Sequence, residues 1–112
     1  MSTPPVRVAD RLVLTLALDG RDVGLLVAFP WAGGFFLEHV VVFPDAPATT
    51  LLALLQAGLD EANRREAKHI GIFQPTQGMD SRLRTVAQAF GFEPYHVAED
   101  GVFLVKRAEE AA

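Results

Sequence analysis

The sequence contains no cysteine, and this absence excludes several kinds of chemistry. Disulfide bonds, a catalytic thiolate and zinc sites built on cysteine all require that residue. No apolar run approaches the roughly 20 residues that a helix needs to cross a bilayer. The N-terminal sequence MSTPPVRVAD lacks the apolar segment of a secretory signal peptide. We therefore expect a protein that is not secreted, and that is cytoplasmic, or virion-associated if a phage encodes it.

Positive charge is also scarce. The 112 residues include 10 Lys and Arg against 14 Asp and Glu, and the only adjacent basic pairs are Arg64-Arg65 and Lys106-Arg107. This acidic balance argues against nucleic acid, because backbone phosphates need a basic surface. Half of the residues are hydrophobic, as in a packed globular protein. We expect an N-terminal arm over 1–10, one domain over 11–107 and a C-terminal tail over 108–112.

The first half of the sequence predicts three strands. Residues 11–18 alternate between leucine and smaller side chains, and Asp19-Gly20 is a strong hairpin signal. The returning strand covers 22–29 and is followed by a turn over 30–34. A third strand over 35–43 is apolar on both faces, which is typical of a central strand covered on both sides.

The second half predicts two helices and three further strands. The helices cover 50–67 and 80–90, and the strands cover 68–73, 95–98 and 102–106. The resulting order, β-β-β-α-β-α-β-β, predicts an α/β (α+β) protein with a mixed sheet. The two strands that flank the first helix should be parallel, with a right-handed crossover, and the others antiparallel.

Two short motifs resemble the GNAT (Gcn5-related N-acetyltransferase) family. LEHVVVFPD, Leu37 to Asp45, is similar to the family's strand that ends in a V-x-P turn, and AFGFEPY, Ala89 to Tyr95, is similar to its L-G-F helix end. The resemblance covers roughly residues 11–107 and implies the core of the GNAT fold, entered after the family's N-terminal helices. In the family those helices help to cover the sheet and form part of the acceptor-substrate site.

The resemblance also implies a place for acetyl-CoA. In the family, a Q/R-x-x-G-x-G/A turn binds the pyrophosphate through its backbone amides. The matching turn here has no glycine, and its Pro47 has no N–H. With Thr49 or Thr50 as an N-cap, we expect an ordinary capped turn in place of the phosphate cradle. If acetyl-CoA binds, the resemblance places it against Val42, Ala48, Thr49, Thr50, Leu51 and Gln74.

Of the two catalytic groups that the family uses, a base and an acid, the sequence offers a candidate only for the base. Many family members place a general base on the strand before this turn, and Glu38 lies on the matching strand. The alternative is that Glu38 pairs with an Arg or Lys of a neighbouring strand. The family's tyrosine general acid corresponds here to Ala87, and its frequent asparagine seven residues earlier corresponds to Asp80. Without the tyrosine, only water could protonate the leaving thiolate, at a reduced rate.

Other polar positions carry weaker signals. The three histidines show no metal-ligand spacing, so we expect no metal site. Gln74-Pro75 follows the fourth strand, where family members separate two parallel strands to admit the pantetheine arm. Pro75 would remove one ladder hydrogen bond there. Trp31 is either a packing anchor or, if exposed, an aromatic that contacts a partner.

Three hypotheses stay open. The first is a degenerate GNAT-like protein-interaction or structural module, in a virion or accessory role, that transfers no acyl group and needs no cofactor. The second is a minimal acetyl-CoA-dependent N-acyltransferase that uses Glu38, and the third is a small-molecule binding module near Gln74. The altered turn and Ala87 favour the first. Because two helices can hardly cover every apolar strand face, we expect self-association or a protein partner on uncovered sheet surface.

Overall fold

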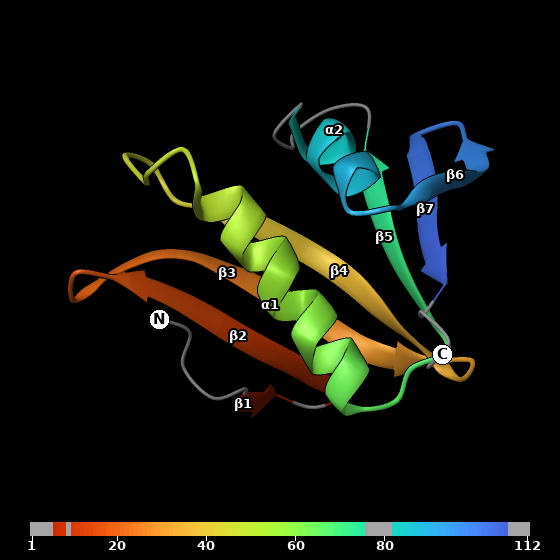
Figure 1. Ribbon diagram of the computed structural model, residues 1–112, viewed down its shortest axis with the longest axis horizontal. Helices are drawn as coiled ribbons and strands as arrows, with labels where there is room; N and C mark the ends of the chain where they lie inside the picture. The colour runs from red at the N-terminus through yellow and green to blue at the C-terminus, as the bar shows by residue number, and fades with distance from the viewer. Residues whose placement is uncertain (1–5, 9, 76–81, 108–112) are drawn as a thin grey trace.

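The computed structural model describes residues 6–8, 10–75 and 82–107, which form one seven-stranded sheet and two helices (Figure 1). The strands lie in the order β1-β2-β3-β4-β5-β7-β6, and only β4 and β5 are parallel. The elements are β1 Val6–Val8, β2 Arg11–Leu18, β3 Arg21–Trp31, β4 Gly34–Val42, α1 Thr50–Arg64, β5 His69–Pro75, α2 Arg82–Ala89, β6 Glu93–Ala98 and β7 Gly101–Arg107. The predicted order is therefore confirmed from β2 onward, and so is the mixed α+β sheet.

Several element ends differ from the sequence prediction. The strand β1 lies within the segment expected to be an N-terminal arm. Helix α1 ends at Arg64 instead of residue 67, because Glu66 takes a positive φ of 55° and the amide of Ala67 donates back to the carbonyl of Ala62 at 3.0 Å. This left-handed ending closes the helix. Neither described helix is long and apolar enough to cross a membrane.

Both tight turns of the first three long strands use left-handed backbone. Asp19 and Gly20 have φ of 53° and 75°, and Ala32 and Gly33 have φ of 50° and 80°. Two consecutive positive φ values are typical of the two-residue hairpin turn that matches the twist of the strands. The second turn is thus shorter than the expected 30–34, and β3 continues through Pro30 and Trp31.

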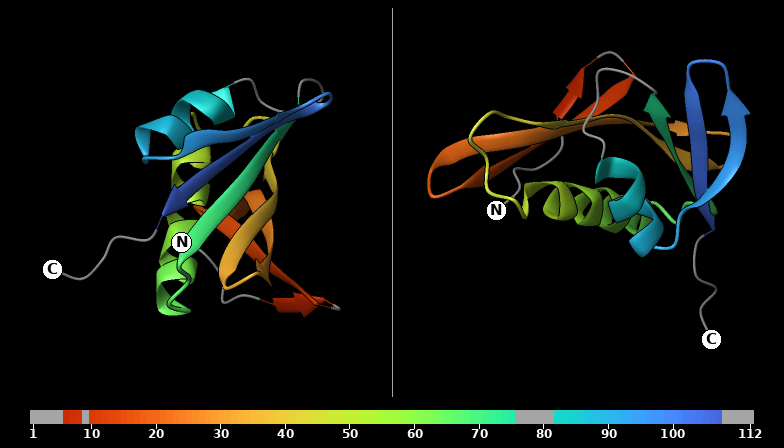
Figure 2. Two further views of the ribbon diagram at one scale, coloured as in Figure 1. Left: turned by 90° about the vertical axis from the view of Figure 1, so that its right-hand side faces the viewer. Right: turned by 90° about the horizontal axis from the view of Figure 1, so that it is seen from above.

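Both helices cover the same face of the sheet (Figure 2). That face holds the core, in which the following residues are almost completely buried: Leu26, Leu37, Leu54, Leu55, Ile70, Ile72, Leu83, Phe92 and Leu104. The expectation that residues 35–43 are covered on both faces is wrong. Leu37 faces α1, whereas Phe36 and Glu38 lie half-exposed on the other face, over which the described residues place no helix. We call this second surface the open face.

Helix α1 approaches the sheet closely because two glycines make room for it. A Cβ atom on Gly24 of β3 would lie 2.7 Å from the carbonyl oxygen of Val41 and 2.8 Å from Cδ1 of Leu54. A Cβ atom on Gly58 of α1 would lie 3.0 Å from Cδ2 of Leu26. Side chains would therefore push the helix away at both points. This packing sets the position of the first turn of α1 against the sheet.

Candidate functional site

The strands β4 and β5 separate after a short parallel ladder. Their paired residues are Phe35 with Ile70, Phe36 with Gly71 and Leu37 with Ile72. Beyond this point β4 continues to Val42 and β5 to Pro75 without further pairing, and the two strands diverge in Figure 1. The splay that the family resemblance implied near Gln74-Pro75 is therefore present.

A β-bulge lies where this separation begins. Val27 of β3 pairs with His39 of β4, and Ala28 pairs with Leu37, so Glu38 is the extra residue of the bulge. Bulges turn side chains out of the regular alternation and are common beside active sites. Here the bulge lets Leu37 and Val40 both face the core while Glu38 points to the open face.

The Glu38 carboxylate is held by Arg11 of β2. Nε of Arg11 donates to Oε1 at 2.9 Å, and a terminal nitrogen of Arg11 donates to Oε2 at 3.3 Å. To reach Glu38 the guanidinium crosses β3 and lies 4.1 Å from the centre of the Phe29 ring. The two side chains are 33% and 28% exposed, so water reaches both. Glu38 thus pairs with an arginine, as the alternative to a free general base proposed. The arginine, however, lies on β2, which is not adjacent to β4 in the sheet.

This pair has an electrostatic consequence for Arg11. Its hydrogen bond to Glu38 raises the pKa of Arg11, although partial burial acts in the opposite direction and the nearby Asp10 adds to the increase. Arg11 therefore carries its charge throughout the neutral range. Any proton acceptor role for Glu38 takes place beside a permanent cation.

The first turn of α1 is not capped by a side chain. Thr49 occupies the N-cap position with a helical backbone, φ −82° and ψ −3°, and makes no side-chain capping hydrogen bond. A capping hydroxyl needs an extended backbone to reach the helix amides, so this geometry prevents it. The capped turn expected from the sequence is therefore wrong. The amides of Leu51 and Leu52 donate to no residue that the structure describes. Unpaired amides in the first turn of a helix are the groups that attract an anion.

The side chains of the predicted cofactor positions differ in access. Ala48 and Thr49 are exposed, and Val42 at the end of β4 is half-buried. Thr50 is fully buried, and its Oγ1 has no hydrogen-bond partner in the described part of the chain. Leu51 is only 3% exposed. Leu51 could thus contribute to a ligand only through its backbone, whereas the Thr50 amide already donates to the carbonyl of Pro47 at 3.0 Å.

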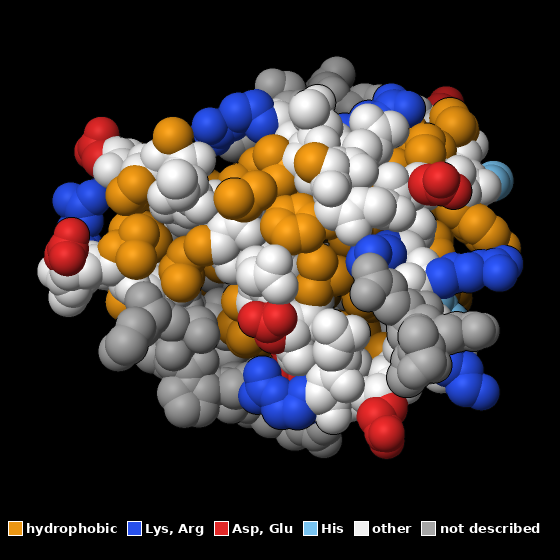
Figure 3. Space-filling view, viewed as in Figure 1, with side chains coloured by type: hydrophobic (Ala, Val, Ile, Leu, Met, Phe, Trp, Pro, Cys, Tyr) orange, Lys and Arg blue, Asp and Glu red, His pale blue; other side chains and the backbone are white. Residues whose placement is uncertain are grey.

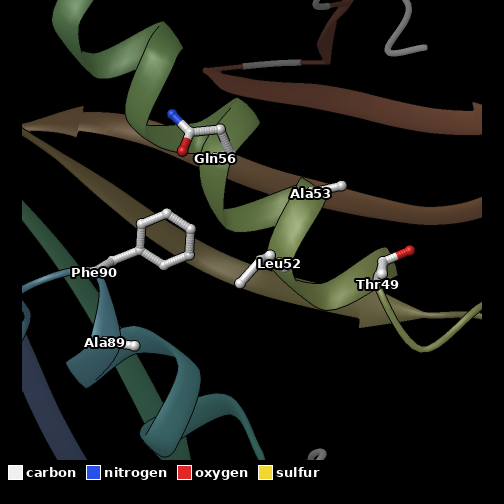
Figure 4. Close-up of a pocket in the computed structure, with 6 residues that line it drawn as sticks. All are labelled: Thr49, Leu52, Ala53, Gln56, Ala89 and Phe90. Atoms are coloured by element: carbon white, nitrogen blue, oxygen red, sulfur yellow. The ribbon is translucent and has the colours of Figure 1, made fainter.

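A groove of ≈ 560 Å³ lies between the N-terminal half of α1 and the end of α2. Apolar side chains gather over this region in Figure 3, and Figure 4 shows Phe90 and Leu52 pointing toward each other across it while the Thr49 hydroxyl points away. The groove is lined by Thr49, Leu52, Ala53, Gln56, Ala89 and Phe90. Sequence reasoning found only Thr49 among these as a site residue. The available signal was Phe90, which lies within the AFGFEPY motif.

Gln74 lies half-buried on β5, beside the splay. Its Nε2 donates to the carbonyl of Pro75 at 3.0 Å. Its Oε1 is buried and accepts no hydrogen bond from the described residues. A buried acceptor without a partner among the described residues is uncommon, and this oxygen has the capacity to accept a hydrogen bond from a ligand or a water.

The remaining predicted positions do not add an acid or a metal ligand. Ala87 is fully buried in the core, so the position of the family's tyrosine faces away from solvent. Asp80 lies outside the described residues. Within the described segments, no group of three or more His, Cys, Asp or Glu is placed to hold a metal ion.

Several solved structures with this architecture are acetyltransferases. The PaiA N-acetyltransferase from Thermoplasma acidophilum in complex with coenzyme A is 15% identical, with a TM-score of 0.75 over 88% of this chain and 62% of that one. A GNAT family acetyltransferase from Elizabethkingia anophelis with acetyl-CoA bound is 13% identical, with a TM-score of 0.76 over 88% and 77%. The ribosomal-protein-S18-alanine N-acetyltransferase from Escherichia coli is 16% identical, with a TM-score of 0.75 over 95% and 74%.

These similarities concern the fold. No protein-family model and no curated protein sequence matches the chain. The chain spans 62% of the length of the Thermoplasma protein. At identities of 13–16%, what these proteins share with the chain is the arrangement of the sheet and helices. With its splayed β4 and β5, its bulge at Glu38 and these structural neighbours, the chain has the GNAT acetyltransferase fold.

Proposed function

We propose that the chain binds acetyl-CoA and acts as a minimal N-acyltransferase. The observation that carries this proposal is the separation of β4 and β5, which begins at the Glu38 bulge. The uncapped first turn of α1 offers amides of Leu51 and Leu52 to an anion. Support also comes from the fold, because two structural neighbours contain coenzyme A or acetyl-CoA.

Each part of the site would hold a different part of the cofactor. The amides at the start of α1 would bind the pyrophosphate, which the positive end of the helix attracts even without glycines. The apolar groove beside Phe90 suits the adenosine. The pantetheine arm would enter the splay, where the unpartnered Oε1 of Gln74 would accept a hydrogen bond from an amide N–H.

In the transfer step, the amine nitrogen forms a bond to the thioester carbonyl and the bond from that carbon to sulfur breaks. Glu38 would accept the proton that leaves the amine, directly or through water. The thiolate would take a proton from water, because Ala87 supplies none. Glu38 would have to share its carboxylate between Arg11 and the amine, so we expect slow turnover.

The first test is calorimetric titration with acetyl-CoA, with CoA as a control ligand. We expect saturable binding in the micromolar range, and no heat up to millimolar acetyl-CoA would remove the enzyme proposal. Glu38→Gln should then lower the rate of amine acetylation by roughly 100-fold or more and leave acetyl-CoA binding unchanged. Glu99→Gln, at an exposed turn between β6 and β7, is the matched control.

The Arg11–Glu38 pair and the buried Ala87 also favour a second candidate function, in which the fold makes protein contacts and transfers no acyl group. No cofactor is needed in this case. The contact surface would be the apolar part of the open face around Val27, and the partner a second copy, a cellular protein or a virion protein if a phage encodes the chain. Absent acetyl-CoA binding together with self-association in light scattering would favour this function.

A further inference from the structure

The open face carries a second cavity, which is separate from the groove between the helices. It has a volume of ≈ 620 Å³ and lies between the Ala32–Gly33 turn and the strands β5, β6 and β7. We call it the aromatic hollow. Its principal side chains are Trp31, Phe36, His69, His96, Phe103 and Arg107.

The floor of the aromatic hollow is a connected set of rings. Phe36 lies in the middle, with its ring centre 6.3 Å from those of Trp31 and Phe103. Gly71 of the paired strand makes room for this ring, because a Cβ atom there would lie 3.0 Å from Cδ1 of Phe36. Packing on both sides therefore holds the floor in one arrangement. Trp31 is 59% exposed, so it presents a free aromatic surface to a ligand.

The polar groups of the aromatic hollow are all neutral or positive. Trp31 packs edge-on against His69, at 6.4 Å and 89°, and His96 lies 6.2 Å from Phe103 between ring centres. The guanidinium of Arg107 is exposed and forms no ion pair with the described residues. No Asp or Glu of the described chain lines the cavity. In a chain with a net charge of −4, this is a local site of the opposite sign.

This chemistry selects among ligand classes. A cluster of aromatic rings favours a flat aromatic or a cationic ligand. A cation would be repelled by Arg107, so an aromatic cage for ammonium groups does not fit. A guanidinium with free N–H groups is the preferred partner of a carboxylate, which it binds through two hydrogen bonds. Apolar walls with few polar groups are typical of small-molecule sites.

We propose that the aromatic hollow binds a small planar aromatic carboxylate. The aromatic ring lies over Phe36 between Trp31 and Phe103, and the carboxylate pairs with Arg107. This site goes beyond the proposed acyltransferase function and does not depend on it, because the groove for acetyl-CoA lies on the helix-covered face. Binding of the carboxylate is therefore measured without any coenzyme.

The test uses 2-naphthoate as the probe and the fluorescence of Trp31, the single tryptophan of the chain, as the reporter. Neutral 2-naphthamide and cationic 2-naphthylmethylammonium have nearly the same shape. We expect saturable quenching by naphthoate, with an affinity roughly tenfold above that of the amide, since a charge-assisted hydrogen bond contributes at least this much. The ammonium compound should bind most weakly.

Two variants locate the charge that is responsible. Arg107→Gln should reduce the affinity for naphthoate roughly tenfold and leave that for naphthamide unchanged. Arg84→Gln, an exposed arginine on α2, is the matched control and should change neither. Equal binding of all three probes, an unchanged naphthoate affinity in Arg107→Gln, or no saturable quenching up to millimolar naphthoate would overturn the proposal. If Arg107→Gln fails to fold, the relative affinities of the three probes for the unmodified chain still test the proposal.

Discussion

At the scale of single residues, the position of Arg11 decides how Glu38 can act. The guanidinium spans β3, lies over the Phe29 ring and binds both carboxylate oxygens of Glu38. A free carboxylate would be ready to accept a proton, whereas this one is already paired. The paired carboxylate belongs to the bulge residue, which lies at the start of the splay. A structural role and the proposed catalytic role of Glu38 therefore meet at one side chain.

A double-mutant cycle measures the structural part of this role. We expect Arg11→Gln and Glu38→Gln to show a small favourable coupling in urea unfolding, because both side chains are about a third exposed and solvent screens the pair. Leu26→Ala is the reference for a large effect, since loss of a fully buried leucine costs about 2–5 kcal/mol. A coupling as large as that reference would mean that the pair is a main determinant of the fold.

The same pair predicts how stability depends on pH. The pKa of Arg11 is raised in the folded state, mainly by its hydrogen bond to Glu38. A raised pKa stabilises the fold fully below the unfolded-state pKa, and this contribution is lost as the pH rises through the folded-state pKa. Both values lie far above neutrality. The stability difference between the unmodified chain and Arg11→Gln should thus stay constant from about pH 6 to 9 in urea titrations. A decline within this range would contradict it.

At the scale of elements, the contact between β3 and α1 sets where the first turn of the helix lies. Gly24→Val should destabilise the chain by about 2–4 kcal/mol, because the new side chain would collide with the Val41 carbonyl and with Leu54. Gly20→Asn is the control: Gly20 has a φ of 75° with open space around it, and asparagine tolerates this conformation. If Gly24→Val and Gly20→Asn changed the thermal midpoint equally, α1 would be able to shift away from β3 without a loss of stability.

The start of α1 offers a second test at this scale. If its amides bind a pyrophosphate, Thr49→Asp places a negative charge beside the anion and should weaken acetyl-CoA binding roughly tenfold or more. Thr49→Asn has a similar size and no charge, and should change the affinity by no more than about threefold. Calorimetry on both variants gives the comparison. Equal affinities for the two would place the pyrophosphate elsewhere.

At the scale of the whole molecule, the two faces of the sheet are unlike each other. The described helices cover one face and bury its leucines and isoleucines. The open face presents half-buried apolar side chains around Val27, followed by the aromatic hollow toward β7. Extensive exposed apolar surface is typical of an interaction site. The proposed protein contact and the proposed small-molecule site would thus share one face.

This asymmetry predicts association of the chain with itself. We expect light scattering to show dimers or larger species at micromolar concentration, since association would cover the apolar open face. Val27→Lys, in the middle of β3, should shift the chain toward the monomer. Leu52→Lys is the control, because it also replaces an apolar residue by a charged one but lies on α1, on the opposite side of the molecule. It should not change the oligomeric state. If the unmodified chain were a monomer at all concentrations, the prediction of self-association would be wrong.

The sequence predicted much of the fold because local signals and hydrophobic periodicity agreed. Alternation over 11–18, the Asp19-Gly20 turn and the leucine stripe after Thr50 each specify an element without distant contacts. The strand β1 was missed because three residues carry too little periodicity. The extension of β3 through Trp31 was missed because Pro30 and two glycines imitate a longer turn.

The candidate site was predicted only in part. The family resemblance pointed to Glu38, to the start of α1 and to Gln74. The partner of Glu38 was not identifiable, because Arg11 lies 27 residues earlier and on a strand that is not adjacent. The missing cap at Thr49 depends on a backbone dihedral angle that residue type does not determine. Phe90 and Leu52 meet only because α1 and α2 pack on the same face.

The sequence by itself determined the order of the elements from β2 onward, the left-handed turn at Asp19-Gly20 and the absence of glycine at the start of α1, because these depend on neighbouring residues. The tertiary structure decided the splay of β4 and β5, the bulge at Glu38 and its ion pair, and the aromatic hollow. These features arise from contacts between segments far apart in the chain. Whether a carboxylate is free or a ring is exposed follows from which strands become neighbours and which face the helices cover.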